Sequence, residues 1–289
     1  MLDYNGELFP DSHPVLSAKD IGFHYGLGLY ETFYVKNRKV AFFEEHLKRF
    51  YLSTDYFQYK LAGDFSTQLL RRIQRLLDSE EVTDARLRLT FSQGATALLQ
   101  PDPEKFSSVL SVQKIYSHSR SVRMMLASIR KPYPSIYPPH VKYTSNTYSI
   151  YSYMEAIRNG FDEGVLVTQN DLIAEGSFCN LFWVDVHGQL KTPAVSCSIL
   201  DGVTRSKLLQ AAENVGVTIE IGEYHRNDLD TCKELYISSS TRGILPVRQL
   251  DGRTFSEEYS LQVQKVSEAY LDLLHKSLED WQINLTRPG

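Results

Sequence analysis

The sequence predicts a mixed α/β or α+β protein built from two domains of unequal size. Strand-like and helix-like runs are interspersed through both halves of the chain, and each half arranges them differently. A length of 289 residues suits about two packed domains, and 42% apolar residues are enough for a sizeable core. A polar stretch at 117–121 separates the halves, so the expected domains are a smaller one over 1–117 and a larger one over 118–289.

The first half predicts strands and two helices. Residues 15–36 combine β-branched and aromatic residues with three glycines, which is typical of strands joined by tight turns. Apolar residues recur at three- and four-residue steps over 42–57 and 64–78, which predicts helices there. The segment 85–91 alternates cleanly and predicts a half-buried strand with Arg86 and Arg88 on one face. Further strands are expected at 108–113 and 121–129.

The second half begins with a Pro-rich loop over 131–140 that leads to Lys142. We expect helices at 145–160, from about residue 204, and over 257–281, the last being long and amphipathic. Strand patterns occur at 164–168, 181–186, 217–221 and 234–238.

Composition excludes several classes of protein. The 31 Lys and Arg against 35 Asp and Glu give a net charge of −4, which argues against a nucleic-acid partner. Three widely spaced cysteines indicate neither a disulfide scaffold nor a zinc site, and they favour a reducing cytoplasm. The first residues, MLDYNGELFPD, are acidic and lack the apolar core of a secretory signal, and no run of 18 apolar residues predicts a membrane span.

Familiar catalytic motifs are absent from the sequence. The pair Gly26 and Gly28 suggests a dinucleotide loop, but Glu31 stands where the third glycine is required. The eight histidines show no metal-ligand spacing, so no metal is expected, and His24 and His46 are interpreted as structural. No GxSxG is present, which leaves serine hydrolase chemistry unsupported.

Two hydroxyl-rich turns favour an anion site. Thr204 stands where a helix is expected to begin, and a helix N-terminus binds phosphate well, although Thr204 as a simple helix cap explains the same pattern. The second turn, at 238–241, follows an apolar strand with four consecutive hydroxyls, which is also ordinary for a polar loop. Together they suggest one phosphate held from two sides.

A lysine and a glutamate add a third feature. Lys142 ends a Tyr- and Pro-rich loop, where partial burial would make its amine a Schiff-base nucleophile, whereas an exposed lysine is only a solvated charge. Glu175 is expected just after a strand, where a carboxylate can hold a pyridine nitrogen protonated.

At these residues the chain resembles the class IV (fold type IV) pyridoxal-phosphate enzymes, which include branched-chain aminotransferases, D-amino-acid aminotransferases and aminodeoxychorismate lyases. Eight elements follow in the family's order from about residue 20 to 247. They are FHYGLGLYET at 23–32, EHLKRF at 45–50, KYTSN at 142–146, EAIRNGFDE at 155–163, EGSFCNLF at 175–182, TP at 192–193, DGVTR at 201–205 and GILPV at 243–247.

The resemblance implies a pyridoxal 5′-phosphate cofactor and a role for each matched residue. Lys142 matches the Schiff-base lysine, and Glu175 matches the partner of the pyridine nitrogen. The residues that match phosphate contacts are Arg49, Val203, Thr204, Ser240 and Thr241. The resemblance also implies a larger C-terminal domain with a barrel-like sheet, a cofactor in the cleft between the domains, and a homodimer.

The substrate is less defined because the chain departs from the family patterns. Tyr34 replaces an arginine usual in branched-chain enzymes, and Thr147 follows the motif asparagine where those enzymes have tyrosine. The stretch 92–99 lacks the Arg-x-His pair of the D-amino-acid enzymes. Candidates that contact substrate are Tyr25, Tyr30 and Arg88, with a core role for Tyr30 and a structural role for Arg88 as alternatives.

These features predict an aminotransferase that moves an amino group between an L-amino acid, with the branched-chain type as a candidate, and a 2-keto acid. The alternative within the family is 4-amino-4-deoxychorismate lyase, which uses the same lysine and cofactor but eliminates pyruvate. The alternative of another class is a protein that binds the cofactor without catalysis, which the intact Lys142 and Glu175 argue against.

Overall fold

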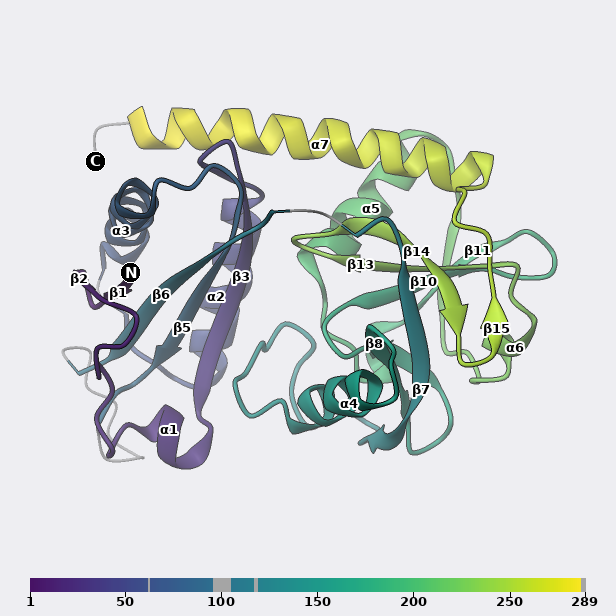
Figure 1. The fold of residues 1–289 in the computed structure, drawn as a ribbon, viewed down its shortest axis with the longest axis horizontal. Coiled ribbons are helices and arrows are strands. Elements are labelled where there is room, and N and C mark those ends of the chain that lie inside the picture. The colour runs from purple at the N-terminus through teal and green to yellow at the C-terminus, as the bar shows by residue number, and fades with distance from the viewer. Residues whose placement is uncertain (62, 96–104, 117–118, 287–289) are drawn as a thin grey trace. The chain divides into compact units, whose positions relative to one another are not determined.

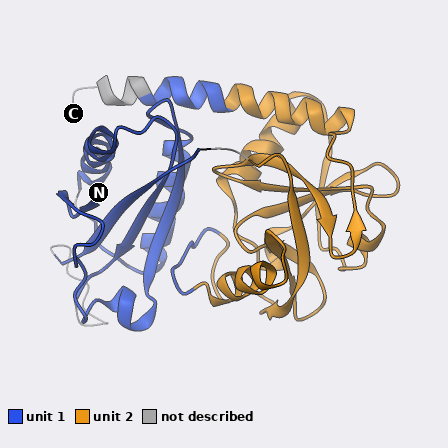
Figure 2. Ribbon diagram, viewed as in Figure 1, with its two compact units in different colours: residues 1–117, 140–145, 274–289 blue, residues 118–139, 146–273 orange. Residues whose placement is uncertain are grey.

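The computed structural model describes residues 1–61, 63–95, 105–116 and 119–286. The chain forms two compact units (Figure 2). Unit 1 contains residues 1–117, 140–145 and 274–289, and unit 2 contains residues 118–139 and 146–273. The domain boundary expected at 117/118 lies outside the described residues, and the division of the chain there stays a prediction.

Unit 1 contains a six-stranded antiparallel sheet with the order β2-β1-β6-β5-β3-β4 (Figure 1). Helix α2 packs on β3, and α3 packs on β6 and β1. The elements of this unit are β1 (Leu2–Tyr4), β2 (Glu7–Phe9), α1 (Ile21–Tyr25), β3 (Gly28–Lys36), β4 (Lys39–Val40), α2 (Phe43–Tyr56), α3 (Phe65–Glu80), β5 (Ala85–Ser92) and β6 (Ser107–Lys114).

The core of unit 1 follows from the periodicity of its elements. In β5, Leu87 and Leu89 are buried while Arg86 is exposed and Arg88 half-buried, which confirms the predicted alternation. The ring of Phe50 on α2 lies 5.5 Å from Phe65 on α3, centre to centre, and 5.6 Å from the Phe91 ring on β5. This aromatic cluster joins both helices to the sheet.

The strands expected throughout 15–36 are only partly present. Residues Ile21–Tyr25 form the short helix α1, because the Asp20 carboxylate accepts hydrogen bonds from the backbone N–H groups of Gly22 and Phe23. Gly26 ends the helix with φ +68°, and the strand begins only at Gly28. The expectation of strands before residue 28 was wrong because the cap at Asp20 was missed.

Unit 2 contains a curled nine-stranded mixed sheet in which β12-β11-β10-β13-β14-β7-β8-β9 are neighbours and β15 pairs with β14 (Figure 1). The neighbours β7 and β8, β14 and β7, and β11 and β12 are parallel. The elements are β7 (Val122–Lys131), α4 (Thr147–Arg158), β8 (Glu163–Thr168), β9 (Ile173–Gly176), β10 (Asn180–Val184), β11 (Leu190–Pro193), a 3₁₀ turn (Val195–Cys197), α5 (Val203–Asn214), β12 (Ile219–Gly222), α6 (Asp228–Thr231), β13 (Glu234–Ser239), β14 (Gly243–Leu250) and β15 (Arg253–Thr254). Helix α7 (Leu261–Thr286) belongs to unit 2 up to residue 273 and to unit 1 from residue 274.

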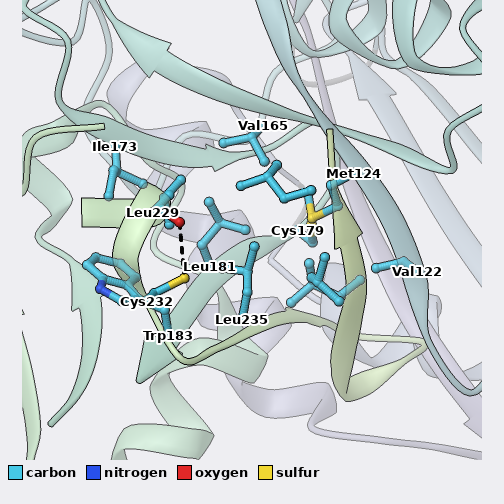
Figure 3. Packing of buried hydrophobic residues seen from close by; sticks show 13 residues of the cluster. Val122, Met124, Val165, Ile173, Cys179, Leu181, Trp183, Leu229, Cys232 and Leu235 are labelled. Carbon is cyan, nitrogen blue, oxygen red and sulfur yellow. Dashed lines mark hydrogen bonds between the residues drawn. The ribbon is translucent and has the colours of Figure 1, made fainter. Parts of the chain in front are cut away.

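The sheet of unit 2 folds around an apolar core of aliphatic residues with Trp183 and two cysteines (Figure 3). Cys179 and Cys232 are free thiols, and the Cys232 thiol donates to the carbonyl oxygen of Leu229 at 3.3 Å. Cys197, the third cysteine, is also free and buried in this unit. The cysteines therefore act as small core residues.

Two differences from the sequence expectations occur in unit 2. Glu175 lies within the short strand β9 rather than after a strand, because four residues paired with β8 gave no alternation to detect. Helix α7 begins at Leu261, four residues after the expected start.

In the described part of the chain, no helix combines the length and apolarity needed to cross a membrane.

Candidate active site

The segment that carries Lys142 pairs with the beginning of β3 in unit 1. The backbone N–H of Tyr30 donates to the carbonyl oxygen of Lys142 at 2.9 Å, and the N–H of Thr144 donates to the carbonyl oxygen of Gly28 at 2.7 Å. On the other side of Lys142, the Ser53 hydroxyl on α2 donates to the carbonyl oxygen of His140 at 3.0 Å. Lys142 is therefore fixed between two backbone anchors rather than carried on a free loop.

Gly26 and Gly28 have a packing role here. A Cβ at Gly28 would lie 2.7 Å from the Thr144 hydroxyl, and a Cβ at Gly26 would lie 2.6 Å from the Cβ of Ser145. The two glycines let the lysine segment approach β3 closely, which explains the motif that resembles a dinucleotide loop without any nucleotide.

The Lys142 amine lies beside an aromatic ring that a second cation also covers. Its Nζ is 4.6 Å from the centre of the Tyr30 ring, and the guanidinium carbon of Arg88 is 3.8 Å from the same centre. The Arg88 Nε donates to the Thr90 hydroxyl at 3.1 Å, which orients the guanidinium. Burial alone raises the pKa of the Tyr30 phenol, but the charges of Lys142 and Arg88 outweigh it, and the pKa is lowered.

Arg49 is held by a buried ion pair on the opposite face of β3. Its Nε donates to Oε1 of Glu31 at 2.8 Å, and a terminal nitrogen donates to Oε2 at 2.6 Å. His46 also contacts Glu31, with Nδ1 2.8 Å from Oε2. Burial raises the pKa of Glu31, but Arg49 and His46 more than compensate and bring it to about 2. Burial lowers the pKa of His46, which favours the neutral imidazole as a Glu31 partner.

Tyr25 is placed differently from the other predicted substrate residues. It lies at the end of α1 with 57% of its surface exposed, and its ring makes an edge contact with His24 at 5.6 Å. Unit 1 thus brings Lys142, Tyr30 and Arg88 into one cluster, while Tyr25 is an exposed side chain on a separate element.

Glu175 in unit 2 is buried and accepts three hydrogen bonds. Lys131 Nζ is 2.5 Å from Oε1, and the backbone N–H of Leu200 donates to Oε2 at 2.9 Å. The Asn180 amide is 3.4 Å from Oε2 and also donates to the Leu200 carbonyl oxygen at 2.9 Å. The carboxylate is therefore a fixed, fully oriented hydrogen-bond acceptor.

The residues after the 3₁₀ turn connect this carboxylate to the Pro-rich loop. The Ser198 hydroxyl donates to the carbonyl oxygen of Pro132 at 2.6 Å. The backbone N–H of Asp201 donates to the carbonyl oxygen of Pro139 at 2.7 Å. The same stretch contains Leu200, and it leads directly into α5. One short segment thus braces both ends of the loop 132–139 and the Glu175 side chain.

The N-terminus of α5 has the properties of a phosphate cradle. Its N-cap residue, Gly202, provides no side chain to cap the first N–H groups, and Val203 and Thr204 follow at the first helical positions. Thr204 is buried, and its hydroxyl finds no hydrogen-bond partner among the described residues. A Cβ at Gly202 would lie 2.1 Å from the Asn180 side-chain oxygen, so only glycine fits.

The hydroxyl-rich turn at 238–241 is connected to the N-terminus of α5 by the pairing of strands β13 and β10. Ser238 on β13 pairs with Asn180 on β10, the residue packed against Gly202. Ser238 is buried, and within the described chain its hydroxyl also has no partner. Ser240 and Thr241 form the turn from β13 to β14. Unpaired buried hydroxyls beside a helix N-terminus fit an oxyanion, so these residues suit the phosphate of the expected cofactor.

A family model described as amino-transferase class IV matches residues 28–250. The chain belongs to the class IV aminotransferases. Enzymes of this family use pyridoxal 5′-phosphate, so the resemblance expected from the sequence is confirmed. In the described residues of the chain, no three His, Cys, Asp or Glu side chains gather as a metal site.

Relatives of the chain include both aminotransferases and a lyase. The chain is 26% identical over 259 residues to the aminodeoxychorismate lyase of Bacillus subtilis, covering 87% of each chain. It is 24% identical over 291 residues to the branched-chain-amino-acid aminotransferase of Escherichia coli, covering 96% of this chain and 94% of that one. A solved structure of the Escherichia coli enzyme matches with a TM-score of 0.84 at 22% identity, covering 97% of each chain.

A branched-chain aminotransferase from the archaeon Thermoproteus uzoniensis, solved with norvaline, matches with a TM-score of 0.81 at 20% identity, covering 97% of this chain and 96% of that one. These likenesses confirm the expected fold type IV architecture.

Two charged residues of this site, Lys131 and Glu31, have partners that local sequence patterns do not reveal. In the sequence, Lys131 marks only the start of the Pro-rich loop, and Glu31 breaks a glycine motif and lies in the family element at 23–32. Glu31 lies among buried apolar residues of β3, which is the signal that points to a buried ion pair, whereas Lys131 ends β7 between half-buried residues and carries no such signal. Their partners, 44 and 18 residues away, are not visible from local patterns.

Proposed function

We propose that the protein transfers the amino group of an L-amino acid of the branched-chain type to a 2-keto acid, with pyridoxal 5′-phosphate bound covalently to Lys142. The observation that carries this proposal is the Lys142 segment, which backbone hydrogen bonds fix on β3 so that its amine lies beside the Tyr30 ring that Arg88 also covers. The similarity to branched-chain aminotransferases over almost the whole chain supports the substrate class.

Each residue of the site has a defined task in this proposal. When bound, the cofactor supplies an aldehyde that joins an amine and a ring that withdraws electrons from the substrate α-carbon. The substrate amine would displace Lys142 Nζ from the cofactor, and the freed amine would then remove the proton from the substrate α-carbon and donate it again. Glu175 accepts the N–H of the ring, and Arg88 binds the substrate carboxylate.

The phosphate of the cofactor is the anchor that orients the ring. We assign it to the N–H groups of Val203 and Thr204, the hydroxyls of Ser240 and Thr241, and the Arg49 guanidinium, which Glu31 orients. The unpartnered Thr204 and Ser238 hydroxyls support an anion at this place. Bound phosphate would give both buried hydroxyls the partner that they need.

The test is a single-turnover reaction of the cofactor-loaded protein with L-valine, L-leucine and L-glutamate in turn. The proposal predicts that each donor that reacts yields one equivalent of its 2-keto acid and leaves the cofactor as pyridoxamine 5′-phosphate. A protein that binds the cofactor but converts none of the donors contradicts the proposal and leaves the lyase and a non-catalytic binding protein as the alternatives.

The second candidate is 4-amino-4-deoxychorismate lyase. The Bacillus subtilis relative supports it, as do Tyr34 and Thr147, which depart from the branched-chain pattern. Lys142 and Glu175 serve either reaction, so the products distinguish them. Release of pyruvate from 4-amino-4-deoxychorismate, without keto acid from any L-amino acid, would establish the lyase.

We also propose a homodimer in the cytoplasm. Four apolar residues at helical spacing on α4 are 43–49% exposed, which favours burial against a second copy: Ile150, Tyr151, Met154 and Ile157. Three free, buried cysteines suit a reducing compartment. Light scattering should show a dimer for the native protein and a monomer for the Met154→Lys variant. A native monomer would contradict the assembly.

A further inference from the structure

Lys131 is a charged residue in the site for which the family comparison and the sequence assign no task. It is the last residue of β7, and its side chain is 10% exposed, as is that of Glu175. The 2.5 Å contact between Lys131 Nζ and Glu175 Oε1 joins these two buried charges. Burying a lysine is costly, so a lysine at this position needs a reason beyond solubility.

The Glu175 carboxylate has its two oxygens occupied by different kinds of donor. Oε2 is oriented by the Leu200 backbone N–H and the Asn180 amide, both of which are neutral. Oε1 contacts the Lys131 ammonium, the positively charged member of the set. Orientation of the carboxylate therefore has two anchors besides Lys131, whereas charge compensation at this distance comes from Lys131.

We propose that Lys131 is a positioning residue that sets how strongly Glu175 holds a proton on the ring nitrogen of the bound cofactor. This inference rests on the proposed function, because it takes Glu175 as the partner of that nitrogen. A protonated ring and the Lys131 ammonium are two cations that share one carboxylate. Their mutual repulsion destabilises the protonated form of the ring nitrogen. The nitrogen therefore loses its proton at a lower pH than in a site without Lys131.

Other charged or titratable groups near the carboxylate do not take over this task. Arg205 on α5 acts electrostatically on Glu175, but its Nη2 donates to the Pro193 carbonyl oxygen at 2.9 Å and its charge lies 3.7 Å from Asp201. Burial raises the pKa of the Cys179 thiol well above its ordinary range, so Cys179 is neutral beside Glu175. Replacing Lys131 leaves both groups in place, so the variant isolates one charge.

Lys131→Gln is the matched substitution, because it removes the charge and keeps an N–H that can donate to Oε1. Lys131→Met removes the charge and the N–H donor, and Lys131→Arg keeps the charge and an N–H donor. Each variant is loaded with pyridoxamine 5′-phosphate, whose near-ultraviolet band changes when the ring nitrogen loses its proton. The band is followed from pH 6 to pH 10, with thermal unfolding of every variant as a control for folding.

The expected result is a deprotonation midpoint about 1 pH unit or more higher in Lys131→Gln than in the native protein, with Lys131→Met shifted in the same direction. Lys131→Arg should titrate like the native protein. A band that follows the same pH course in the native protein and in Lys131→Gln overturns the inference. Failure of the native protein to bind pyridoxamine 5′-phosphate at all would instead overturn the proposed function.

Discussion

Tyr30 and Lys142 are joined twice, once through the backbone and once through the side chains. The Tyr30 N–H donates to the Lys142 carbonyl oxygen at 2.9 Å, while the Lys142 amine lies 4.6 Å from the Tyr30 ring. The strand therefore fixes both the position of the lysine segment and the surface that its amine faces. Arg88 on the neighbouring strand completes this arrangement with a second positive charge.

Arg88 should matter for substrate binding, and Arg86 should not. The two arginines lie two residues apart on the same face of β5, but Arg86 is exposed and Arg88 stacks on Tyr30. Loss of a charge-assisted contact with a carboxylate costs about 1.5–3 kcal/mol, so Arg88→Gln should raise KM for the amino acid about 10- to 100-fold. Steady-state kinetics check this, with Arg86→Gln as the control. Equal KM values for both variants would remove Arg88 from the substrate site.

Gly28→Ala should displace the lysine segment. The added Cβ would lie 2.7 Å from the Thr144 hydroxyl, and the strand cannot move away without breaking its pairing with β5. We expect reduced thermal stability and weaker cofactor binding, measured by fluorescence titration. Gly252→Ala is the control, since no atom lies within 4 Å of its added Cβ. A Gly28→Ala protein that binds the cofactor normally would show that the close approach is not required.

The Glu31 carboxylate should make stability depend on pH in acid. Its folded pKa of about 2 lies below the ordinary 4.5, so its contribution is complete above pH 4.5 and is lost as the pH falls toward 2. That difference in pKa corresponds to about 3 kcal/mol in the free energy of unfolding. Glu31→Gln should therefore be clearly less stable than the native protein at pH 7, and the gap should narrow below pH 4.5.

Thermal unfolding across this pH range measures the gap. Asp78→Asn is the control, because its ion pair with Arg38 lies at the surface of the same unit and contributes about 0–1 kcal/mol. A gap between Glu31→Gln and the native protein that stays constant down to pH 3 would contradict the assigned pKa.

Thr204→Val should weaken phosphate binding without destabilising the protein. The buried hydroxyl has no partner among the described residues, so its removal costs the ligand-free protein nothing in hydrogen bonds. With the cofactor phosphate as its partner, its loss should lower affinity about fivefold to tenfold. Thr192→Val provides the contrast, because that hydroxyl already donates to Leu181 at 2.8 Å. The predicted pattern is lost affinity in the first variant and lost stability in the second.

Local patterns in the sequence predicted the elements whose burial repeats regularly. The alternation at 85–91 and the helical spacing at 42–57 both correspond to elements found in the structure, because one face of each packs on a core. Residues 21–25 were mispredicted because a single side-chain cap at Asp20 outweighs the β propensity of the segment. Short strands such as β9 carry too few residues for any period to show.

Local sequence motifs identified some residues of the candidate site but not the pairs that the fold brings together. Lys142, Glu175 and Thr204 stand in motifs of ordered spacing, so the sequence alone was enough to choose them. The pairs Glu31–Arg49 and Lys131–Glu175 depend on where strands bring distant residues, and no local spacing encodes them. The role of Gly28 became clear only when Thr144 was found against it.

The most direct test of the account is the visible absorbance of the purified protein loaded with pyridoxal 5′-phosphate, recorded before and after L-glutamate and a branched-chain L-amino acid. We predict a yellow band that Lys142→Ala lacks and the exposed-lysine control Lys265→Ala retains, and that bleaches when the amino donor is added. A protein that takes up no cofactor, or a band that is unchanged in Lys142→Ala, would contradict the central claim.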